Sequence, residues 1–206
     1  MTGVILRRPD DGVCDASIWE GDLHLWAAAG NWRKIARRGI VATILARYLG
    51  VDPRSVEFGR GSNGKPELIT QSPAGEVRFS VSTSEGMLAL AVGAAPIGID
   101  VEPRARVVSL DGMLEFVCTE RERDQLSEPM PVAARSEAFI WCWTGKEACA
   151  KACGLGLAVP FSEIDVGTGP VGGVCAVAPV AGSDLGPWVL HRVDALAGYA
   201  VAIAVL

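Results

Sequence analysis

Four charged side chains are spaced so that they could hold a metal ion beside a phosphate group. Asp100 and Glu102 alternate with apolar residues in the segment 97–102. This pattern is typical of a strand, which would place both carboxylates on one face. Glu147 and Lys151 lie four residues apart in a segment that predicts a helix, so they share a helix face. Adjacent anions repel each other unless a cation lies between them. Oxygen ligands without His or Cys favour magnesium, so the pattern predicts a magnesium site.

Each part of this pattern also has an ordinary structural explanation. Glu147 and Lys151 could form an ion pair that supports the helix. Thr144 and Glu147 match a capping box, in which two side chains satisfy backbone amides at the start of a helix. Asp100 and Glu102 could simply face water at the end of a strand. The residues leave these alternatives open for each motif taken singly, whereas the order and spacing of the motifs together favour a site.

The rest of the chain predicts an alternation of helices and strands. The clearest helix runs over 31–49, where apolar residues recur at helical spacing and Gly50 follows as a stop signal. Further helices are predicted over 110–116, 120–126 and 133–153. Strands are predicted over 23–26, 77–81, 87–92, 97–102, 164–166, 174–178, 188–193 and 199–205.

Length and composition narrow the class of protein. The chain has 206 residues, of which 50% are hydrophobic, so it can bury a substantial core. A net charge of −5 gives no general attraction to nucleic acid or to an anionic membrane. No apolar run in the sequence reaches the length of a membrane span, and we expect no secretory signal at residues 1–11. Its six cysteines form no CxxC pair, and we expect them to be small buried residues. These features predict a cytoplasmic protein without a membrane or nucleic-acid partner, and we expect it to be a monomer.

The motifs resemble those of the Sfp-type 4'-phosphopantetheinyl transferases over about residues 33–206. The family's G-[I/V]-D-[I/V]-E strand matches 98–102, and its W-[S/T]-x-K-E-[A/S]-x-x-K helix matches 143–151. Three further segments resemble its F-x6-G-K-P, F-N-[I/L]-S-H-S and F-F-x-x-x-E motifs, and they lie at 58–66, 79–84 and 116–120. The pair Gly198-Tyr199 before a final apolar strand also fits.

The resemblance implies a fold and a reaction. The fold would be α+β with two pseudo-symmetric lobes, residues 1–97 and 98–206, and an active site in the cleft between them. The reaction would be transfer of the 4'-phosphopantetheine arm of coenzyme A, the co-substrate, to a serine of an acyl or peptidyl carrier protein, with Mg²⁺ as the metal. The alternatives are a related metal-dependent enzyme with a changed substrate, acting for example on a carrier-bound intermediate, and a catalytically silent module that binds carriers.

The resemblance also implies roles for individual residues. Asp100, Glu102 and Glu147 match the metal ligands of the family. Glu120 matches the proposed base, and Lys151 matches the lysine that contacts phosphate. These five residues would therefore form the catalytic centre.

The side that binds coenzyme A departs from the family pattern. Lys65 and Ser82 match coenzyme A contacts, but Thr83 replaces a phosphate-contacting histidine, and the position of a phosphate-binding arginine aligns with Ala42. We therefore expect weak recognition of the nucleotide's 3'-phosphate. Basic residues of the predicted helix 31–49 could compensate, or could simply face solvent; they are Arg33, Lys34, Arg37 and Arg38.

Overall fold

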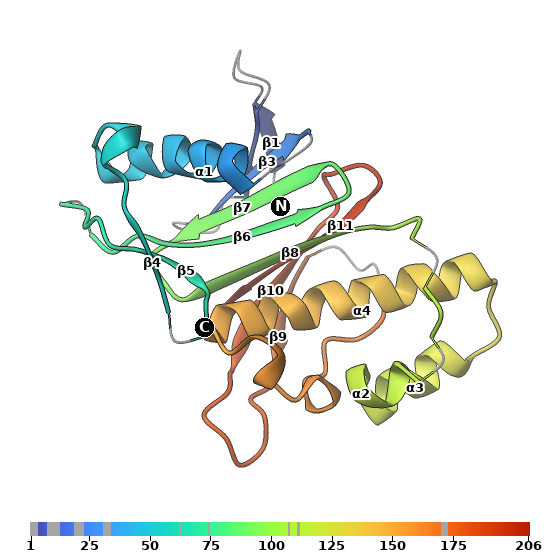
Figure 1. Cartoon of the computed structure of the whole chain (residues 1–206). Helices are drawn as coiled ribbons and strands as arrows, with labels where there is room; N and C mark the ends of the chain where they lie inside the picture. The colour runs from blue at the N-terminus through green and yellow to red at the C-terminus, as the bar shows by residue number, and fades with distance from the viewer. Residues whose placement is uncertain are drawn as a thin grey trace.

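Two antiparallel sheets form the centre of the protein (Figure 1). The computed structural model describes residues 4–7, 13–18, 23–30, 34–61, 63–73, 75–106, 108–110, 112–169 and 173–206. The N-terminal sheet has the order β1 (Val4–Arg7), β2 (Val13–Ile18), β3 (His24–Ala29), β7 (Met87–Gly93) and β6 (Arg78–Ser84). The C-terminal sheet has the order β8 (Ile97–Pro103), β11 (Tyr199–Val205), β10 (Trp188–Val193) and β9 (Gly173–Val177). A small third sheet pairs β4 (Phe58–Arg60) with β5 (Pro66–Leu68).

Four α-helices and three short 3₁₀ turns complete the described part of the chain. The helices are α1 (Lys34–Leu49), α2 (Leu114–Val117), α3 (Glu120–Ser127) and α4 (Val132–Cys153), and the turns are η1 (Pro53–Ser55), η2 (Gly156–Ala158) and η3 (Phe161–Glu163). This mixture of helices and sheets confirms the predicted α+β class. The boundary at residues 97 and 98 and the pseudo-symmetry of two lobes stay predictions.

The two sheets pack against each other on one side and against a helix on the other. Leu45 of α1 packs with Leu90 of β7 on one face of the N-terminal sheet. Because successive strand residues point to opposite faces, Ala89 of β7 points away from α1. Ala89 shares a buried cluster with Ile99 of β8 and Ile203 of β11. The order of layers is therefore α1, N-terminal sheet, C-terminal sheet and α4.

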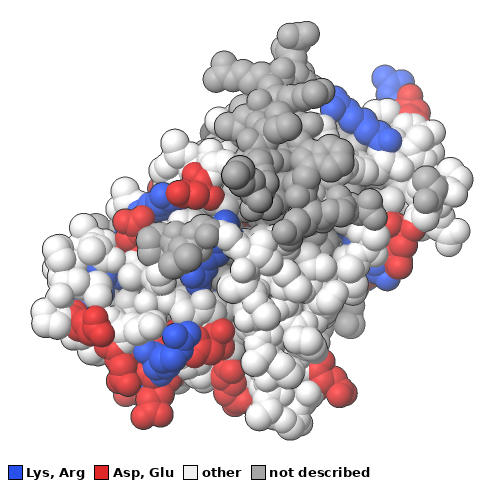
Figure 2. Space-filling view, turned by 180° about the vertical axis from the view of Figure 1, so that it is seen from behind, with Lys and Arg blue, Asp and Glu red and all other residues white. Residues whose placement is uncertain are grey.

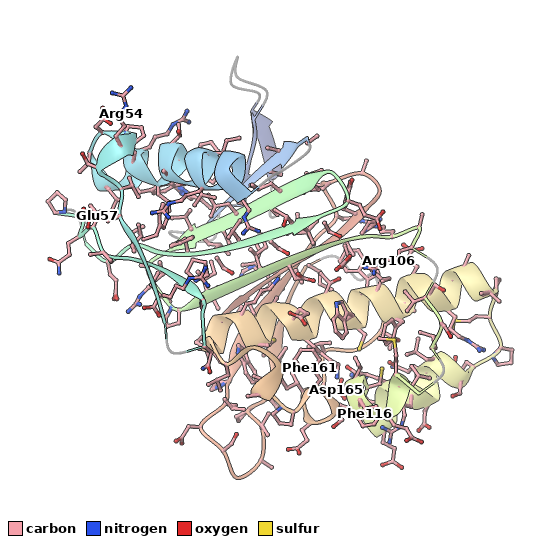
Figure 3. All side chains as sticks on the ribbon, in the orientation of Figure 1. Arg54, Glu57, Arg106, Phe116, Phe161 and Asp165 are labelled. Atoms are coloured by element: carbon pink, nitrogen blue, oxygen red, sulfur yellow. The ribbon has the colours of Figure 1, made fainter. Side chains whose placement is uncertain are left out.

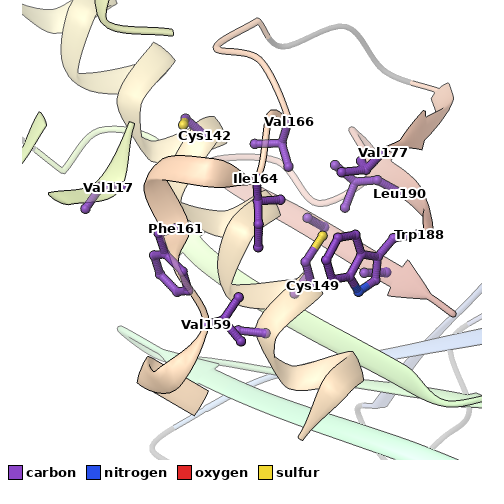
Figure 4. Packing of buried hydrophobic residues seen from close by; sticks show 14 of the residues in the cluster. Val117, Cys142, Cys149, Val159, Phe161, Ile164, Val166, Val177, Trp188 and Leu190 are labelled. Carbon is purple, nitrogen blue, oxygen red and sulfur yellow. The ribbon is translucent and has the colours of Figure 1, made fainter. Parts of the chain in front are cut away.

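Helix α4 lies unusually close to β8. It covers the C-terminal sheet, where Cys149 packs with Leu190 of β10 in the cluster of Figure 4. A Cβ atom added to Gly98 would lie 2.0 Å from the carbonyl oxygen of Ala148, so any side chain there would push the helix away. The glycine of the G-I-D-V-E motif thus lets α4 approach the strand that carries Asp100.

The edge strands of the two sheets, β6 and β8, lie side by side (Figure 1). A tight turn sets the register of β6 with β7, because Glu85 and Gly86 both have positive φ angles of 33° and 84°. Phe79 of β6 packs in the cluster beneath α1, and Ser80 points the other way. The backbone N–H of Ile99 in β8 donates to the hydroxyl of Ser80 at 3.1 Å. Side-chain bonds thus connect the edges of the two sheets.

Several local predictions were wrong. Thr144 caps no helix, since it lies inside α4 and its hydroxyl donates to the carbonyl of Ile140 at 2.7 Å. Residues 164–166 form no strand, because the side chains of Glu122 and Arg192 hold their backbone in an irregular loop. The helix predicted over 110–116 is shorter, and strands β1 and β2 were not predicted. The start of the predicted helix 31–49, residues 31–33, lies outside the described residues.

Acidic side chains gather on one part of the surface. On the face seen in Figure 2 they lie at the lower left, where α2 and α3 are found. In the part of the chain that the structure describes, no helix has the length and apolar character needed to cross a membrane.

Candidate functional site

Asp100 is a buried carboxylate with only one of its two oxygens engaged. The residue is 4% exposed, and its Oδ1 accepts hydrogen bonds from Lys151 Nζ at 2.6 Å and from Ser82 Oγ at 2.8 Å. Its Oδ2 is buried and has no hydrogen-bond partner. Burial raises the pKa of Asp100, and the ammonium of Lys151 offsets only part of that effect. The unpartnered oxygen is therefore a strong acceptor that could take a cation.

Glu102 lies two residues farther along the same face of β8. Its Oε2 accepts a hydrogen bond from Ser84 Oγ at 2.8 Å and another from Arg106 Nη1 at 3.0 Å. Glu102 and Asp100 thus have the same arrangement, in which a serine of β6 and a cation bind one carboxylate oxygen.

Glu147 of α4 is the third carboxylate. Burial raises its pKa; the charges of Asp100 and Glu102 raise it further, and Lys151 lowers it. Because charges alter a pKa strongly only over short distances, Glu147 lies near Asp100 and Glu102. Their oxygens do not all come within 4.8 Å, since among the described residues only a different group meets that spacing. The three carboxylates repel one another because they carry like charges. The ammonium of Lys151 lies against Asp100 and offsets part of this repulsion.

The arrangement fits a hard divalent cation. Three carboxylates supply only oxygen donors, and Asp100 presents a buried oxygen that nothing in the structure satisfies. Such a set is typical of magnesium and lacks the thiolates and imidazoles that favour zinc.

Lys151 pairs with Asp100 and not with Glu147 as an ordinary helix pair would. Its Nζ lies 2.6 Å from Asp100 Oδ1, and it also donates to Ser82 Oγ at 3.2 Å. The helix-supporting pair that the spacing suggested is therefore replaced by a contact between α4 and β8. Since Asp100 is buried, loss of Lys151 would cost more stability than loss of an exposed pair.

Glu120, the predicted base, lies apart from these acids. It is exposed in the first turn of α3, and it is not among the charged groups that alter the pKa of Glu147. In Figure 3, Arg106 lies on the side of α4 that faces the N-terminal sheet, whereas Phe116 of α2 lies on the other side of the helix. Helix α3 follows α2 directly along the chain. The structure therefore brings the three predicted metal ligands and Lys151 together, whereas Glu120 lies outside this group.

Thr83 and Ser82 point to opposite faces of β6. Ser82 binds Asp100 and Lys151, so its hydroxyl belongs to the carboxylate cluster. Thr83 faces α1, where Arg37 Nη1 donates to its Oγ1 at 3.5 Å. The position that aligned with a phosphate-binding arginine, Ala42, is buried in the core beneath α1. Of the basic residues that could compensate, Arg37 reaches the position of the missing histidine.

Lys65 and Arg38 make other contacts. Lys65 Nζ donates to the carbonyl of Ile97 at 2.8 Å and to that of Ala152 at 3.5 Å, and burial lowers its pKa. It therefore ties the segment before β5 to β8 and to the last turn of α4. The guanidinium of Arg38 lies 5.3 Å from the centre of the Phe58 ring. The side chain of Lys34 and all of Arg33 lie outside the described residues.

Three hollows share Pro66 and Phe79 in their linings; one of them reaches α1 and another reaches Glu147. A hollow of about 240 Å³ is lined by Glu147 and Lys151. A second hollow, of about 150 Å³, is lined by Arg37, Arg38 and Arg60. We call it the arginine hollow. The largest of the three, about 520 Å³, is lined by Lys65 and by Ile97 at the start of β8. An extended ligand with phosphates at two points could follow the first two.

A second cluster of ionisable groups lies in the core, where the sequence predicted no combined site. The ligand atoms of Cys118, Glu122 and Cys142 lie within 4.8 Å of one another and are buried. Glu122 is nevertheless fully bonded: Lys146 lies 2.6 Å from its Oε2, and its oxygens also accept the backbone N–H groups of Thr119, Val166 and Gly167. This saturation makes the cluster a structural ion pair and not a metal centre.

The cysteines are less uniformly buried than predicted. Cys118, Cys142 and Cys149 are buried, Cys153 is partly exposed and Cys175 is exposed on β9. Burial raises the pKa of the Cys149 thiol. The side chain of Cys14 lies outside the described residues.

Comparison with known proteins identifies similar sequences. The chain is 34% identical over 139 residues to the 4'-phosphopantetheinyl transferase HetI of a Nostoc species, and the aligned residues cover 67% of this chain and 58% of that protein. It is 27% identical over 127 residues to the 4'-phosphopantetheinyl transferase Sfp of Bacillus subtilis, covering 62% and 54%. It is 31% identical over 185 residues to the L-aminoadipate-semialdehyde dehydrogenase-phosphopantetheinyl transferase of Eremothecium gossypii, covering 81% and 65%. The chain thus spans between 54% and 65% of the length of these relatives.

The part of the chain that matches a family model includes the candidate site. A family model described as the 4'-phosphopantetheinyl transferase superfamily matches residues 96–204, more than half of the 206 residues. The matched span contains β8 and α4 and therefore all three carboxylates and Lys151. The resemblance suggested by the motifs is thereby confirmed, and the chain belongs to the 4'-phosphopantetheinyl transferase superfamily.

Proposed function

We propose that this protein transfers the 4'-phosphopantetheine arm of coenzyme A to a serine hydroxyl of an acyl or peptidyl carrier protein in the cytoplasm. The observation that carries the proposal is the buried Asp100, which keeps one oxygen without a hydrogen-bond partner and binds Lys151 with the other. Lys151 and Glu147 both line a hollow. The relatives described above are named for phosphopantetheinyl transfer.

The residues divide the chemistry between them. Asp100, Glu102 and Glu147 would hold Mg²⁺, which when bound would gather and neutralise the pyrophosphate oxygens of coenzyme A. Lys151 would contact the same phosphates and offset charge as the phosphorus–oxygen bond to the nucleotide breaks. The carrier serine oxygen forms the new bond to phosphorus, and adenosine 3',5'-bisphosphate leaves. The resemblance implies that Glu120 is the base. Because Glu120 is exposed and lies apart from the three carboxylates, we propose that it would take the serine proton through water and not directly.

The hollows support coenzyme A as the donor. The ligand has a 3'-phosphate at one end of the nucleotide and a pyrophosphate several bonds away. The arginine hollow offers cations for the first, and the hollow beside Lys151 leads to the predicted metal site. Lys65 lines the hollow beside Lys151, so it could contact the nucleotide in addition to its bonds to backbone carbonyls.

Intact-mass spectrometry of apo carrier proteins tests the reaction. With saturating coenzyme A and Mg²⁺, we expect an acyl or peptidyl carrier to gain the mass of one phosphopantetheine group. The Glu147→Gln variant is the control, because it removes one proposed ligand charge with little change in shape. If no carrier in a broad panel gains this mass, the transferase proposal fails, and an enzyme with a changed substrate becomes the better explanation of the site.

Arg37 is expected to supply the 3'-phosphate contact that Thr83 and Ala42 cannot. Losing one charge-assisted contact costs roughly 1.5 to 3 kcal/mol, or about ten- to a hundredfold in affinity. Arg37→Ala should therefore weaken coenzyme A binding by about tenfold and leave the binding of dephospho-coenzyme A nearly unchanged. Calorimetric titration of both ligands measures the difference.

Arg47 provides a matched control for Arg37. It lies on the same helix, but its guanidinium packs 5.3 Å from the centre of the Trp26 ring and it lines none of the three hollows. Arg47→Ala should leave the preference between the two ligands as in the wild type. Nearly equal affinities of the wild type for both ligands would agree with the weak recognition of the 3'-phosphate that the sequence predicted, and would contradict the role given to Arg37.

A further inference from the structure

Three alternating serines of β6 point toward β8 and make different bonds. Ser80 accepts the backbone N–H of Ile99, whereas Ser82 and Ser84 donate to carboxylates. Strand β6 belongs to the N-terminal sheet and β8 to the C-terminal sheet. Two hydroxyls from one sheet therefore orient two acids of the other.

The hydrogen bonds given for the two acids fall on one oxygen of each carboxylate. On Asp100, Ser82 and Lys151 both bind Oδ1, and Oδ2 has no partner. On Glu102, the hydroxyl of Ser84 donates to Oε2 at 2.8 Å. A carboxylate held by one oxygen cannot rotate freely, and its second oxygen keeps a fixed direction.

We propose that Ser84 is a positioning residue that orients Glu102 for metal binding. The inference rests on the proposed function, because it takes Glu102 to be a metal ligand. Ser84 touches neither the metal nor the phosphates in this scheme; it acts only through the carboxylate. The N-terminal sheet would then contribute to a metal site whose ligands come from β8 of the C-terminal sheet and from α4.

Ser84 is a better candidate for this role than the other group on the same oxygen. Arg106 is long and its side chain is 51% exposed, so its contact with Glu102 is weakened by solvent and salt. The side chain of Glu102 is only 15% exposed, and Ser84 is partly buried with few rotamers to lose. The short hydroxyl bond is therefore the one that fixes the carboxylate.

Titration of the full chain with Mn²⁺, followed by electron paramagnetic resonance of the free ion, tests the inference without reference to activity. Loss of a hydrogen bond to a metal ligand typically costs about 10- to 100-fold in metal affinity. Ser84→Ala should weaken Mn²⁺ binding by about tenfold. Ser84→Thr keeps the hydroxyl and should bind Mn²⁺ as the wild type does.

Ser80→Ala is the matched control, since Ser80 is on the same face of β6 but binds a backbone amide. It should lower the melting temperature by about 5 °C, because the N–H of Ile99 loses its partner, and it should leave Mn²⁺ affinity unchanged. Wild-type affinity in Ser84→Ala, or equal weakening in both alanine variants, overturns the inference. A different pattern marks failure of the proposed metal site itself: Mn²⁺ fails to bind the wild type, or binds Asp100→Ala equally well.

Discussion

Asp100→Asn is expected to lower turnover with Mg²⁺ at least about a hundredfold, since it removes a charged ligand at the point where phosphate charge develops. The same change should raise stability at neutral pH. Burial raises the pKa of Asp100 more than Lys151 lowers it, so the folded protein disfavours the ionised form. Steady-state kinetics and thermal unfolding of the same preparation measure the two effects.

The pH dependence of stability follows from the sign of this shift. An aspartate whose pKa is raised in the folded state contributes stability below its ordinary pKa, and that contribution is lost as the pH rises through the raised value. The wild type and Asp100→Asn should therefore be equally stable in acid and diverge toward neutral pH, with the variant the more stable. Metal affinity of the wild type should fall on acidification from above the ordinary carboxyl range, because Glu147 is shifted in the same direction.

Asp165→Asn is a suitable control for Asp100→Asn. Its carboxylate pairs with Arg121 near the surface, and that guanidinium lowers its pKa, the opposite shift to that of Asp100. The control should keep its turnover and gain no stability at neutral pH. Full turnover of Asp100→Asn in Mg²⁺ would show that the metal site is misassigned.

Lys146→Met is expected to destabilise the protein by about 3 to 5 kcal/mol, the usual cost of removing one partner of a buried ion pair. Lys146 and Glu122 are both 0% exposed, and Lys146 also donates to the carbonyls of Phe161 and Ile164 at 2.7 and 2.6 Å. Methionine is close in shape but leaves a buried carboxylate and two carbonyls without their cation. Chemical denaturation of wild type and variant at neutral pH measures the difference.

Arg121→Met is the matched control for Lys146→Met. Arg121 precedes Glu122 in α3 and pairs with Asp165, but its side chain is 59% exposed. An exposed pair contributes at most about 1 kcal/mol, so the control should lose little stability. Similar losses in the two variants would contradict the assignment of Lys146 to a buried structural pair.

Lys146 also illustrates the limit of motif reading. It belongs to the W-T-G-K-E-A-C-A-K segment that suggested chemistry, yet it points into the core while Glu147 and Lys151 point toward β8. The true capping box was equally present in the sequence, at Thr119 and Glu122, where each side chain binds the other's backbone N–H. Its pattern of Thr-x-x-Glu is the one that was assigned to Thr144, because spacing alone does not reveal where a helix begins.

The sequence by itself determined which residues share a face. Alternation along 97–102 put Asp100 and Glu102 on one side of a strand, and the four-residue step put Glu147 and Lys151 on one side of a helix. These are local consequences of backbone geometry, so they need no knowledge of distant residues.

Only the tertiary structure decided which partners these side chains meet. Lys151 pairs with Asp100 and not with Glu147 because Gly98 lets α4 approach β8. Ser84 contacts Glu102 because the edges of the two sheets lie side by side. Arg37 reached Thr83 for the same kind of reason. Each contact joins residues that are far apart in the chain. Its formation depends on how the layers pack, and no periodicity in one segment encodes that packing.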